Sequence, residues 1–162
     1  MTTTATPIAE AADSFLSSAR IAVAGASGTP GGNAGNIVYK RLRERGYEVF
    51  AVNPTAEVVE GDACFRDLGD IPGGVEAVVI ATPPDAAEAA MRACIEQGVT
   101  QVWMHRSFGA GSVSTAAADL GREHGVTVID GGCPLMFAPT SDGAHRFLRH
   151  VCTWTGKVPR TV

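Results

Sequence analysis

Short apolar runs recur along the chain, and stretches with helical periodicity separate them. The five apolar runs cover residues 21–24, 47–52, 77–81, 101–104 and 126–129. The run at 77–81 is apolar throughout, as expected of a strand in a parallel sheet with both faces covered. Strands that alternate with helices predict an α/β fold. We therefore expect a single domain with a doubly wound, parallel, five-stranded sheet.

Helical periodicity, with apolar residues three and four positions apart, marks the segments between the runs. Stripes of this kind predict helices over 8–19, 33–45, 85–97, 112–124 and 142–154. In the second of these segments, we expect Ala34, Ile37, Val38 and Leu42 to face the sheet. Asp85 with Glu88 three residues later predicts a capping box at the start of the third. Residues 57–68 show neither period and are expected to be irregular.

Size and composition limit the class of protein. The 162 residues suit one domain, which we divide into a tail and helix start (1–14), a ligand-binding domain (15–135) and a C-terminal loop and helix packed on it (136–162). A hydrophobic content of 45% with 19% charged residues is typical of a folded globular protein. The formal net charge of -4 disfavours nucleic acid as a partner.

Features of secreted and membrane proteins are not visible in the sequence. The N-terminus lacks a basic segment followed by an apolar one, and no apolar run approaches the ~20 residues of a membrane span. The four cysteines are widely spaced, which is typical of reduced thiols. We therefore expect a cytoplasmic protein that does not insert into a membrane.

A glycine-rich stretch follows the first strand and opens the next helix. It reads Gly25-Ala26-Ser27-Gly28-Thr29-Pro30-Gly31-Gly32. Glycines let a backbone approach a ligand without a side-chain clash. The N–H groups at the start of a helix favour a phosphate. The stretch therefore predicts a site for a nucleotide-like diphosphate.

NAD is the first ligand to consider, and two features of the sequence argue against it. The dinucleotide fingerprint requires Gly-x-Gly-x-x-Gly, but Gly25 is followed by Ala26, Ser27 and Gly28. An acidic residue should end the second strand and hold a ribose hydroxyl, but Asn53-Pro54 stands there. A fragment of an NAD(P)-dependent oxidoreductase is therefore an alternative and not the preferred interpretation.

The same region resembles the CoA-binding domain family. The resemblance rests on Gly-Ala-Ser at 25–27, Gly-Tyr-Glu-Val at 46–49 and Val-Asn-Pro at 52–54. Members share a Rossmann-like domain that also forms the N-terminal part of the succinyl-CoA synthetase α-subunit. Ala-Thr-Pro-Pro at 81–84, Val-Trp-Met at 102–104 and Cys-Pro at 133–134 are similar to later segments of that subunit. The resemblance covers residues 15–135 and implies that the cofactor is CoA or an acyl-CoA.

The carboxyl ends of the predicted strands give the candidate binding residues, because ligands of open parallel sheets bind there. We assign the diphosphate to the glycine-rich loop and the adenosine half to Asn53-Pro54. The synthetase subunit carries a lysine after its second-strand proline, where this chain has Thr55-Ala56. The 3′-phosphate of CoA would then need Arg106, Arg66 or solvent, and Arg106 is the best candidate cation, with a surface arginine as the alternative. The full candidate set is Gly25, Ala26, Ser27, Gly28, Thr29, Pro30, Gly31, Asn53, Pro54, Thr82, Pro83, Pro84, Met104, His105 and Arg106.

Catalytic signatures are not recognisable in the sequence. The succinyl-CoA synthetase reaction uses a phosphohistidine in a further domain, for which 162 residues leave no room. Neither a Ser-His-Asp order nor a Gly-x-Ser-x-Gly elbow is present. His105 could act as a base near a thioester, but a binding or structural role is commoner. Cys133 could form a mixed disulfide with the CoA thiol, but a buried structural cysteine is commoner.

These observations favour a small CoA-binding module without catalysis of its own over an enzyme. The alternative within the same resemblance is an acyl-CoA ligase subunit that needs a partner chain, and a homo-oligomer is also compatible with the sequence. We expect no metal site, because the spacing of Cys133, His145, His150 and Cys152 matches no zinc pattern.

Overall fold

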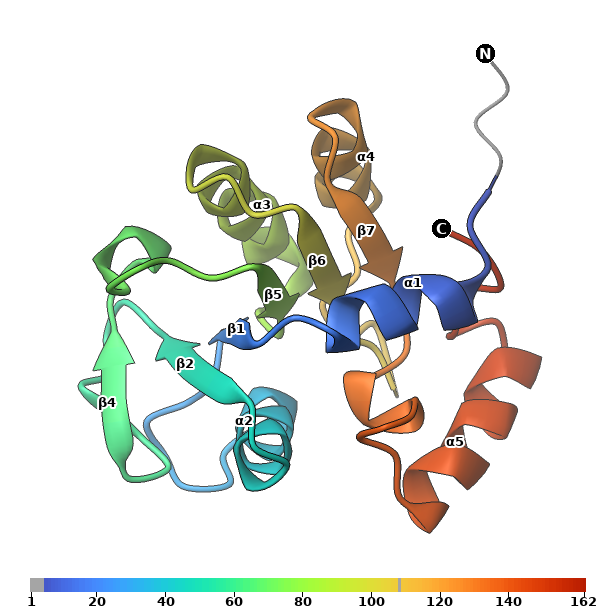
Figure 1. Cartoon of the computed structure of the whole chain (residues 1–162), viewed down its shortest axis with the longest axis horizontal. Coiled ribbons are helices and arrows are strands. Elements are labelled where there is room, and N and C mark those ends of the chain that lie inside the picture. The colour runs from blue at the N-terminus through green and yellow to red at the C-terminus, as the bar shows by residue number, and fades with distance from the viewer. Residues whose placement is uncertain (1–4, 108) are drawn as a thin grey trace.

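Residues 5–107 and 109–162, which the computed structural model describes, form one α/β domain around a seven-stranded sheet (Figure 1). The strand order is β3-β4-β2-β1-β5-β6-β7, and among these strands only the β3–β4 pair is antiparallel. The prediction of a doubly wound α/β fold is confirmed. The strands are β1 (Arg20–Ala24), β2 (Glu48–Val52), β3 (Val58–Val59), β4 (Asp62–Phe65), β5 (Ala77–Ile80), β6 (Gln101–Met104) and β7 (Thr127–Asp130).

The predicted strand number of five was wrong, because residues 57–68 hold two further strands. β3 and β4 form a hairpin whose turn is Glu60-Gly61, with φ angles of 49° and 87°. β4 then pairs in parallel with β2 and extends the sheet beyond it. Strands of two and four residues, which are only partly buried, are too short to show a period of two in the sequence.

Helices cover both faces of the sheet, with α3 and α4 on one face and α1, α2 and α5 on the other (Figure 1). Three 3-10 turns, η1, η2 and η3, occur in the connections. The bounds are α1 (Ile8–Leu16), α2 (Ala34–Glu44), η1 (Leu68–Asp70), η2 (Pro84–Ala86), α3 (Ala87–Glu96), α4 (Thr115–Glu123), η3 (Pro134–Met136) and α5 (Gly143–Trp154).

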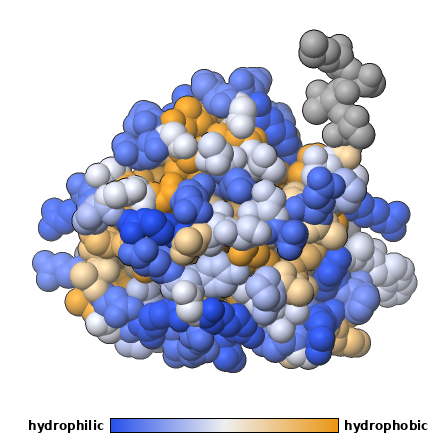
Figure 2. Space-filling model, viewed as in Figure 1, coloured by the Kyte–Doolittle hydropathy of each residue, from blue (hydrophilic) through white to orange (hydrophobic). Residues whose placement is uncertain are grey.

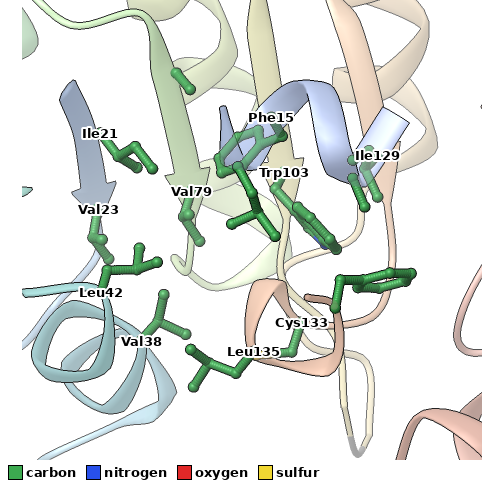
Figure 3. Close-up of a cluster of buried hydrophobic side chains, with 14 of the residues drawn as sticks. Phe15, Ile21, Val23, Val38, Leu42, Val79, Trp103, Ile129, Cys133 and Leu135 are labelled. Atoms are coloured by element: carbon green, nitrogen blue, oxygen red, sulfur yellow. The ribbon is translucent and has the colours of Figure 1, made fainter. Parts of the chain in front are cut away.

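Trp103 on β6 is the largest fully buried side chain and joins several elements into one core. Its ring centroid lies 5.4 Å from that of Phe15 on α1 and 5.3 Å from that of Phe137, which follows η3. Its indole N–H donates to the Gly131 carbonyl at 2.8 Å. Figure 3 shows Phe15 and Trp103 beside each other over the sheet. The C-terminal part of the chain is thus packed on the same core as the strands.

α2 has the predicted position, but its buried face differs from the predicted one. Val38 and Leu42 are buried as expected, whereas Ala34 is exposed and Ile37 keeps 50% of its surface exposed. Asn36 and Tyr39 are buried in their place, because both find polar partners there. Tyr39 Oη donates to Asp62 Oδ2 at 2.7 Å, and the Asn36 side chain bonds to the glycine-rich loop.

The outer side of α2 is strongly hydrophilic, as Figure 2 shows over this helix. Its basic side chains pair with nearby carboxylates. Arg41 contacts Glu44 at 3.1 Å, and Arg43 pairs with Asp62 on β4. The charged side chains of α2 therefore form a solvated face of the helix.

The start of α3 does not contain the predicted capping box. The 3-10 turn Pro84–Ala86 precedes the helix, and Ala86 at the N-cap makes no side-chain cap bond. Pro84 can start this turn because its fixed φ suits a first helical position. Glu88 instead pairs with Arg92 at 2.6 Å. Cys94 lies in the core, fully buried.

α5 lies against η3 and keeps a hydrophobic side exposed. Leu148 and Cys152 pack toward the core, whereas Phe147, Val151 and Trp154 are exposed by 71%, 37% and 89%. After α5, the chain returns to pair with the N-terminal segment through a bridge between Thr161 and Pro7. Among the residues that the structure describes, no helix has both the length and the apolar character needed to cross a lipid bilayer.

Candidate functional site

Gly25 brings two strand-end loops into close contact. It follows β1 with a φ of +98°, which favours glycine. A Cβ at this position would lie 2.7 Å from both the carbonyl carbon of Ala81 and the amide nitrogen of Thr82. Only glycine therefore lets the loop after β1 approach the loop after β5 this closely.

Asn36, on the first turns of α2, fixes the conformation of the glycine-rich loop through hydrogen bonds. Its side chain is fully buried and accepts the Ser27 N–H at 2.7 Å. The same amide donates to the Ser27 carbonyl at 2.9 Å and to Glu60 Oε1 at 2.8 Å. The loop conformation is therefore fixed by a side chain of the helix that it opens.

Glu60, at the β3–β4 turn, supports the other end of the loop. Its carboxylate accepts the Gly31 N–H as well as the Asn36 amide, and it lies 3.8 Å from Lys40 Nζ. The hydrogen bonds from Gly31 and then Asn36 lower the pKa of Glu60. The negatively charged Glu60 side chain is therefore held beside the loop by hydrogen bonds.

Two more asparagines hold the edges of the loop. Asn33 is the N-cap of α2, where its Oδ1 accepts the Asn36 N–H at 3.1 Å and its Nδ2 donates to the Gly25 carbonyl at 2.9 Å. Asn53 follows β2 and donates to the Ala26 carbonyl at 2.9 Å. Its Oδ1 accepts the Thr55 N–H at 2.9 Å, which folds the chain after Pro54 into a turn.

A crevice of about 410 Å³ opens beside the start of α2, and we call it the outer crevice. It brings together the first residues of α2, the loop after β5 and the loop after β6. The predicted residues Thr82, Pro83 and His105 line it. The full lining is Asn33, Ala34, Ala81, Thr82, Pro83, His105, Ser107, Gly111 and Ser112.

A second, smaller cavity of about 230 Å³ adjoins the outer crevice, and we call it the inner cavity. The two share Ala34, His105 and Ser107. Apolar side chains from α2, η3 and α5 form most of its walls. Its lining is Ala34, Ile37, Val38, His105, Ser107, Cys133, Leu135, His145 and Leu148.

His105 stands where the two cavities meet. Only 7% of its surface is exposed, and burial, followed by the neighbouring His145, lowers its pKa to about 4. The imidazole is therefore neutral at pH 7. Its Nε2 lies 3.5 Å from Ser107 Oγ, which is a long contact for a hydrogen bond.

Other predicted site residues have different positions. Met104 is fully buried in the core on the α3–α4 side of the sheet and does not reach the outer crevice. Arg106 lines neither cavity, and its Nε donates to the Gly109 carbonyl at 3.1 Å. In the described part of the chain, no lysine or arginine lines either cavity. The assignment of a phosphate to Arg106 stays a prediction.

The remaining predicted residues line neither the outer crevice nor the inner cavity. Ala26 is fully buried beneath the loop, whereas 28–31 and Pro54 are exposed, and Pro84 begins η2. Phe108, in the loop after β6, lies outside the described residues.

Cys133 lines the inner cavity, and burial raises the pKa of its thiol to about 12. A thiol with this pKa is protonated at pH 7 and is a weak nucleophile. In the described residues, no group of three His, Cys, Asp or Glu side chains is arranged to hold a metal ion.

Sequence reasoning missed the inner cavity. Ile37 and Leu148 each belonged to a helix identified by its periodicity, but the sequence did not show that the two helices face each other across a cavity. Leu148 in particular becomes a wall residue only because α5 folds back beside α2. The exposure of Ile37 beside this cavity is seen only in the structure, because the sequence pattern places this residue on the face toward the sheet.

Comparison with known proteins gives a consistent result. Residues 19–139 match a family model for a CoA binding domain. Over 91 residues the chain is 35% identical to the α-subunit of an ADP-forming acetate–CoA ligase II from Pyrococcus furiosus. This match covers 56% of the chain but only 20% of that subunit. The chain therefore corresponds to a small part of the ligase subunit.

Relatives of similar length also exist. YneT, an uncharacterized protein of Bacillus subtilis, is 28% identical over 121 residues, which covers 75% of this chain and 86% of YneT. A hypothetical protein from Pyrococcus horikoshii has a solved structure with a TM-score of 0.68 and 30% identity, over 79% of this chain and 89% of that one. The structure of Prb, a protein redesigned for binding, has a TM-score of 0.73 and 27% identity, over 84% and 94% of the two chains.

Proposed function

The chain belongs to the CoA-binding domain family, and from that premise we propose that it binds coenzyme A or an acyl-CoA in the outer crevice. The observation that carries the proposal is the position of the α2 N-terminus. Asn33 and Ala34 line the crevice, so the first amides of the helix lie at its wall. The Asn36 N–H is capped by Asn33, whereas the N–H groups of Ala34 and Gly35 have no acceptor within the helix, and such groups favour a phosphate.

The parts of CoA can be assigned to the crevice in order. We assign the diphosphate to the start of α2 and the glycine-rich loop, and the adenosine half to Asn53 and Pro54. The pantetheine arm would then run along Thr82 and Pro83 toward His105. All three residues line the outer crevice. Neutral N–H groups would supply most of the phosphate contacts, since the crevice has no lysine or arginine in its described lining.

We further propose that the chain binds CoA without catalysing a reaction alone. The neutral, buried His105 and the protonated Cys133 form no pair of base and activated nucleophile. A second candidate function is the CoA-binding part of an acyl-CoA ligase that acts with another chain. The likeness to a ligase α-subunit favours that candidate. Cytoplasmic location is part of the same proposal.

A thermal-shift panel of CoA, NAD, NADP and ATP tests the proposal. A ligand present at 100 times its Kd stabilises the folded state by about 2.7 kcal/mol, so CoA should raise the Tm clearly and NAD should not. A shift with NAD at least as large as that with CoA would favour the oxidoreductase alternative instead.

A matched pair of variants tests the position of the phosphate. Ala34 is exposed at the first position of α2, where an acidic residue suits the helix dipole. Ala34→Asp should therefore keep or slightly raise the Tm but weaken CoA binding at least tenfold by repulsion, whereas Ala34→Asn should weaken it far less. Equal CoA affinity in both variants would remove the diphosphate from this helix end.

A further inference from the structure

The inner cavity lies beyond the part of the crevice that CoA itself would fill. It adjoins the outer crevice at Ala34, His105 and Ser107, and its lining contains no residue of the glycine-rich loop. We infer that the inner cavity holds the acyl group of an acyl-CoA, and that this acyl group is short and uncharged. This inference rests on the proposed function, because the pantetheine arm must lead the acyl group to His105.

The walls of the inner cavity suit a hydrocarbon chain. Ile37 and Val38 come from α2, Leu135 from η3 and Leu148 from α5. Figure 3 shows Val38 and Leu135 pointing toward each other from the two sides. Ile37 leaves half of its surface exposed although it borders this cavity, so an acyl chain would cover an apolar side chain that now meets solvent.

His105 provides a polar contact at the junction. A neutral imidazole has one N–H donor and one acceptor nitrogen. Its Nε2 makes only the 3.5 Å contact with Ser107, and among the described residues no partner is found for Nδ1. The thioester carbonyl or the last pantetheine amide would supply a partner to this buried side chain. The acyl chain would then continue past it into the apolar part of the cavity.

The charges near the cavity disfavour an acyl group that ends in a carboxylate. His145 is the basic group at the α5 side, and its Nδ1 is already 2.9 Å from Asp142 Oδ1. The hydrogen bonds from the His145 backbone and side chain lower the pKa of Asp142, which therefore stays negative. A terminal carboxylate would approach this negative charge, which lies outside the lining and is also attracted by Arg41, and the described lining itself offers no lysine or arginine.

The size of the cavity limits the length of the chain. A volume of about 230 Å³ lies below the roughly 300–1,000 Å³ of pockets that hold drug-sized ligands. Acyl groups of a few carbons fit this volume, and long fatty acyl chains do not. His145 and Leu148 lie outside the matched residues 19–139, so the segment after the family domain completes the cavity.

Calorimetric titration of CoA, acetyl-CoA, butyryl-CoA and succinyl-CoA tests the inference. Each methylene removed from water should improve affinity by roughly threefold to fourfold. Butyryl-CoA should therefore bind at least tenfold more tightly than CoA, with acetyl-CoA between them. Succinyl-CoA should bind no more tightly than CoA.

Two substitutions in α5 distinguish an effect on the inner cavity from a general effect on this helix. Leu148→Ser removes an apolar wall and should abolish the gain of butyryl-CoA over CoA, while the Kd of CoA stays within about twofold. Phe147→Ser changes the neighbouring side chain, which is 71% exposed on the other side of α5, and should leave the gain intact. If Leu148→Ser does not fold, Ile37→Ser makes the same test from α2.

The outcomes distinguish the inference from the proposed function. Absence of binding by CoA and by every acyl-CoA overturns both. Binding of CoA without any gain from the butyryl group overturns the inference alone. A gain that survives in Leu148→Ser and Ile37→Ser also overturns it, because the acyl group would then lie elsewhere.

Discussion

The outer crevice and the inner cavity differ in what holds them in shape. Hydrogen bonds fix the glycine-rich loop beside the outer crevice. They join the loop to three asparagine side chains and to the Glu60 carboxylate, which accepts the Gly31 N–H. The inner cavity is bounded mainly by apolar side chains from α2 and from η3 and α5, which follow α2 by about 100 residues in the sequence. A hydrogen-bonded loop has few tolerated geometries, whereas an apolar wall can adjust to changes in volume. Substitutions should therefore cost more at the first region than at the second.

The largest expected effect is at Gly25. In Gly25→Ala, the new Cβ meets two backbone atoms at 2.7 Å, and the φ of +98° is strained for alanine. We expect a loss of about 3 kcal/mol in the free energy of unfolding, measured by urea titration.

Gly31→Ala is the matched control in the same loop. Gly31 also has a positive φ, +63°, but a Cβ there would have no atom within 4 Å. The backbone strain alone should cost about 1 kcal/mol. Equal losses in the two variants would mean that the close approach of the loops at Gly25 does not matter for stability.

A smaller effect is expected at Asn36. Asn36→Ala removes four side-chain hydrogen bonds and leaves the Ser27 N–H and the Glu60 carboxylate without this partner. Unsatisfied buried groups of this kind cost about 1–3 kcal/mol, so we expect a loss of about 2–3 kcal/mol together with weaker CoA binding.

The adjacent residue provides the comparison between the two regions. Ile37→Ala changes the inner cavity at a half-exposed position and should cost less than about 1 kcal/mol. Urea unfolding of both variants, side by side, measures the difference. A larger loss for Ile37→Ala than for Asn36→Ala would reverse the comparison.

The last expected effect is a pH dependence of stability through His105, which lines both cavities. Its pKa is lowered from 6.5 to about 4 in the folded protein. Between these values the unfolded chain binds a proton and the folded protein does not, so stability falls as the pH falls. We expect a loss of up to about 2 kcal/mol between pH 6.5 and 5, at about 1.4 kcal/mol per pH unit.

His105→Gln should remove most of this slope, as urea unfolding at pH 7, 6 and 5 would show. The carboxylates whose pKa values are lowered, Glu60, Asp62 and Asp142, begin to lose their contribution only near their ordinary pKa values of about 4. Measurements above pH 5 therefore separate the contribution of His105 from that of these carboxylates. An unchanged slope in His105→Gln would assign the pH dependence to other groups.

Much of the frame could be predicted from the sequence. The uninterrupted apolar run at β5 and the glycine-rich turn after β1 are local signals. They correctly predict a buried strand and the end of the first strand. The hairpin of β3 and β4 was missed, because β4 is stabilised by pairing with β2 and β3 by pairing with β4, and not by their own sequence pattern.

The candidate site was less accessible to sequence reasoning. The asparagines that hold the loop contact it across 7 to 27 positions, which no local pattern reveals. Ile37 was assigned to the buried stripe because it is apolar, but the partners of Asn36 and Tyr39 set the rotation of α2. The position of Met104 in the core follows from the alternation of side chains along β6, whose two faces are both buried.

The two tryptophans of the chain give it a built-in optical assay. Trp103 is fully buried between Phe15 and Phe137, whereas Trp154 at the end of α5 is 89% exposed. An aqueous quencher such as iodide should reach the emission of Trp154 in the folded protein and that of Trp103 only after unfolding. Fluorescence can therefore follow the environment of α5 and the integrity of the central core separately, in the same sample and without an attached label.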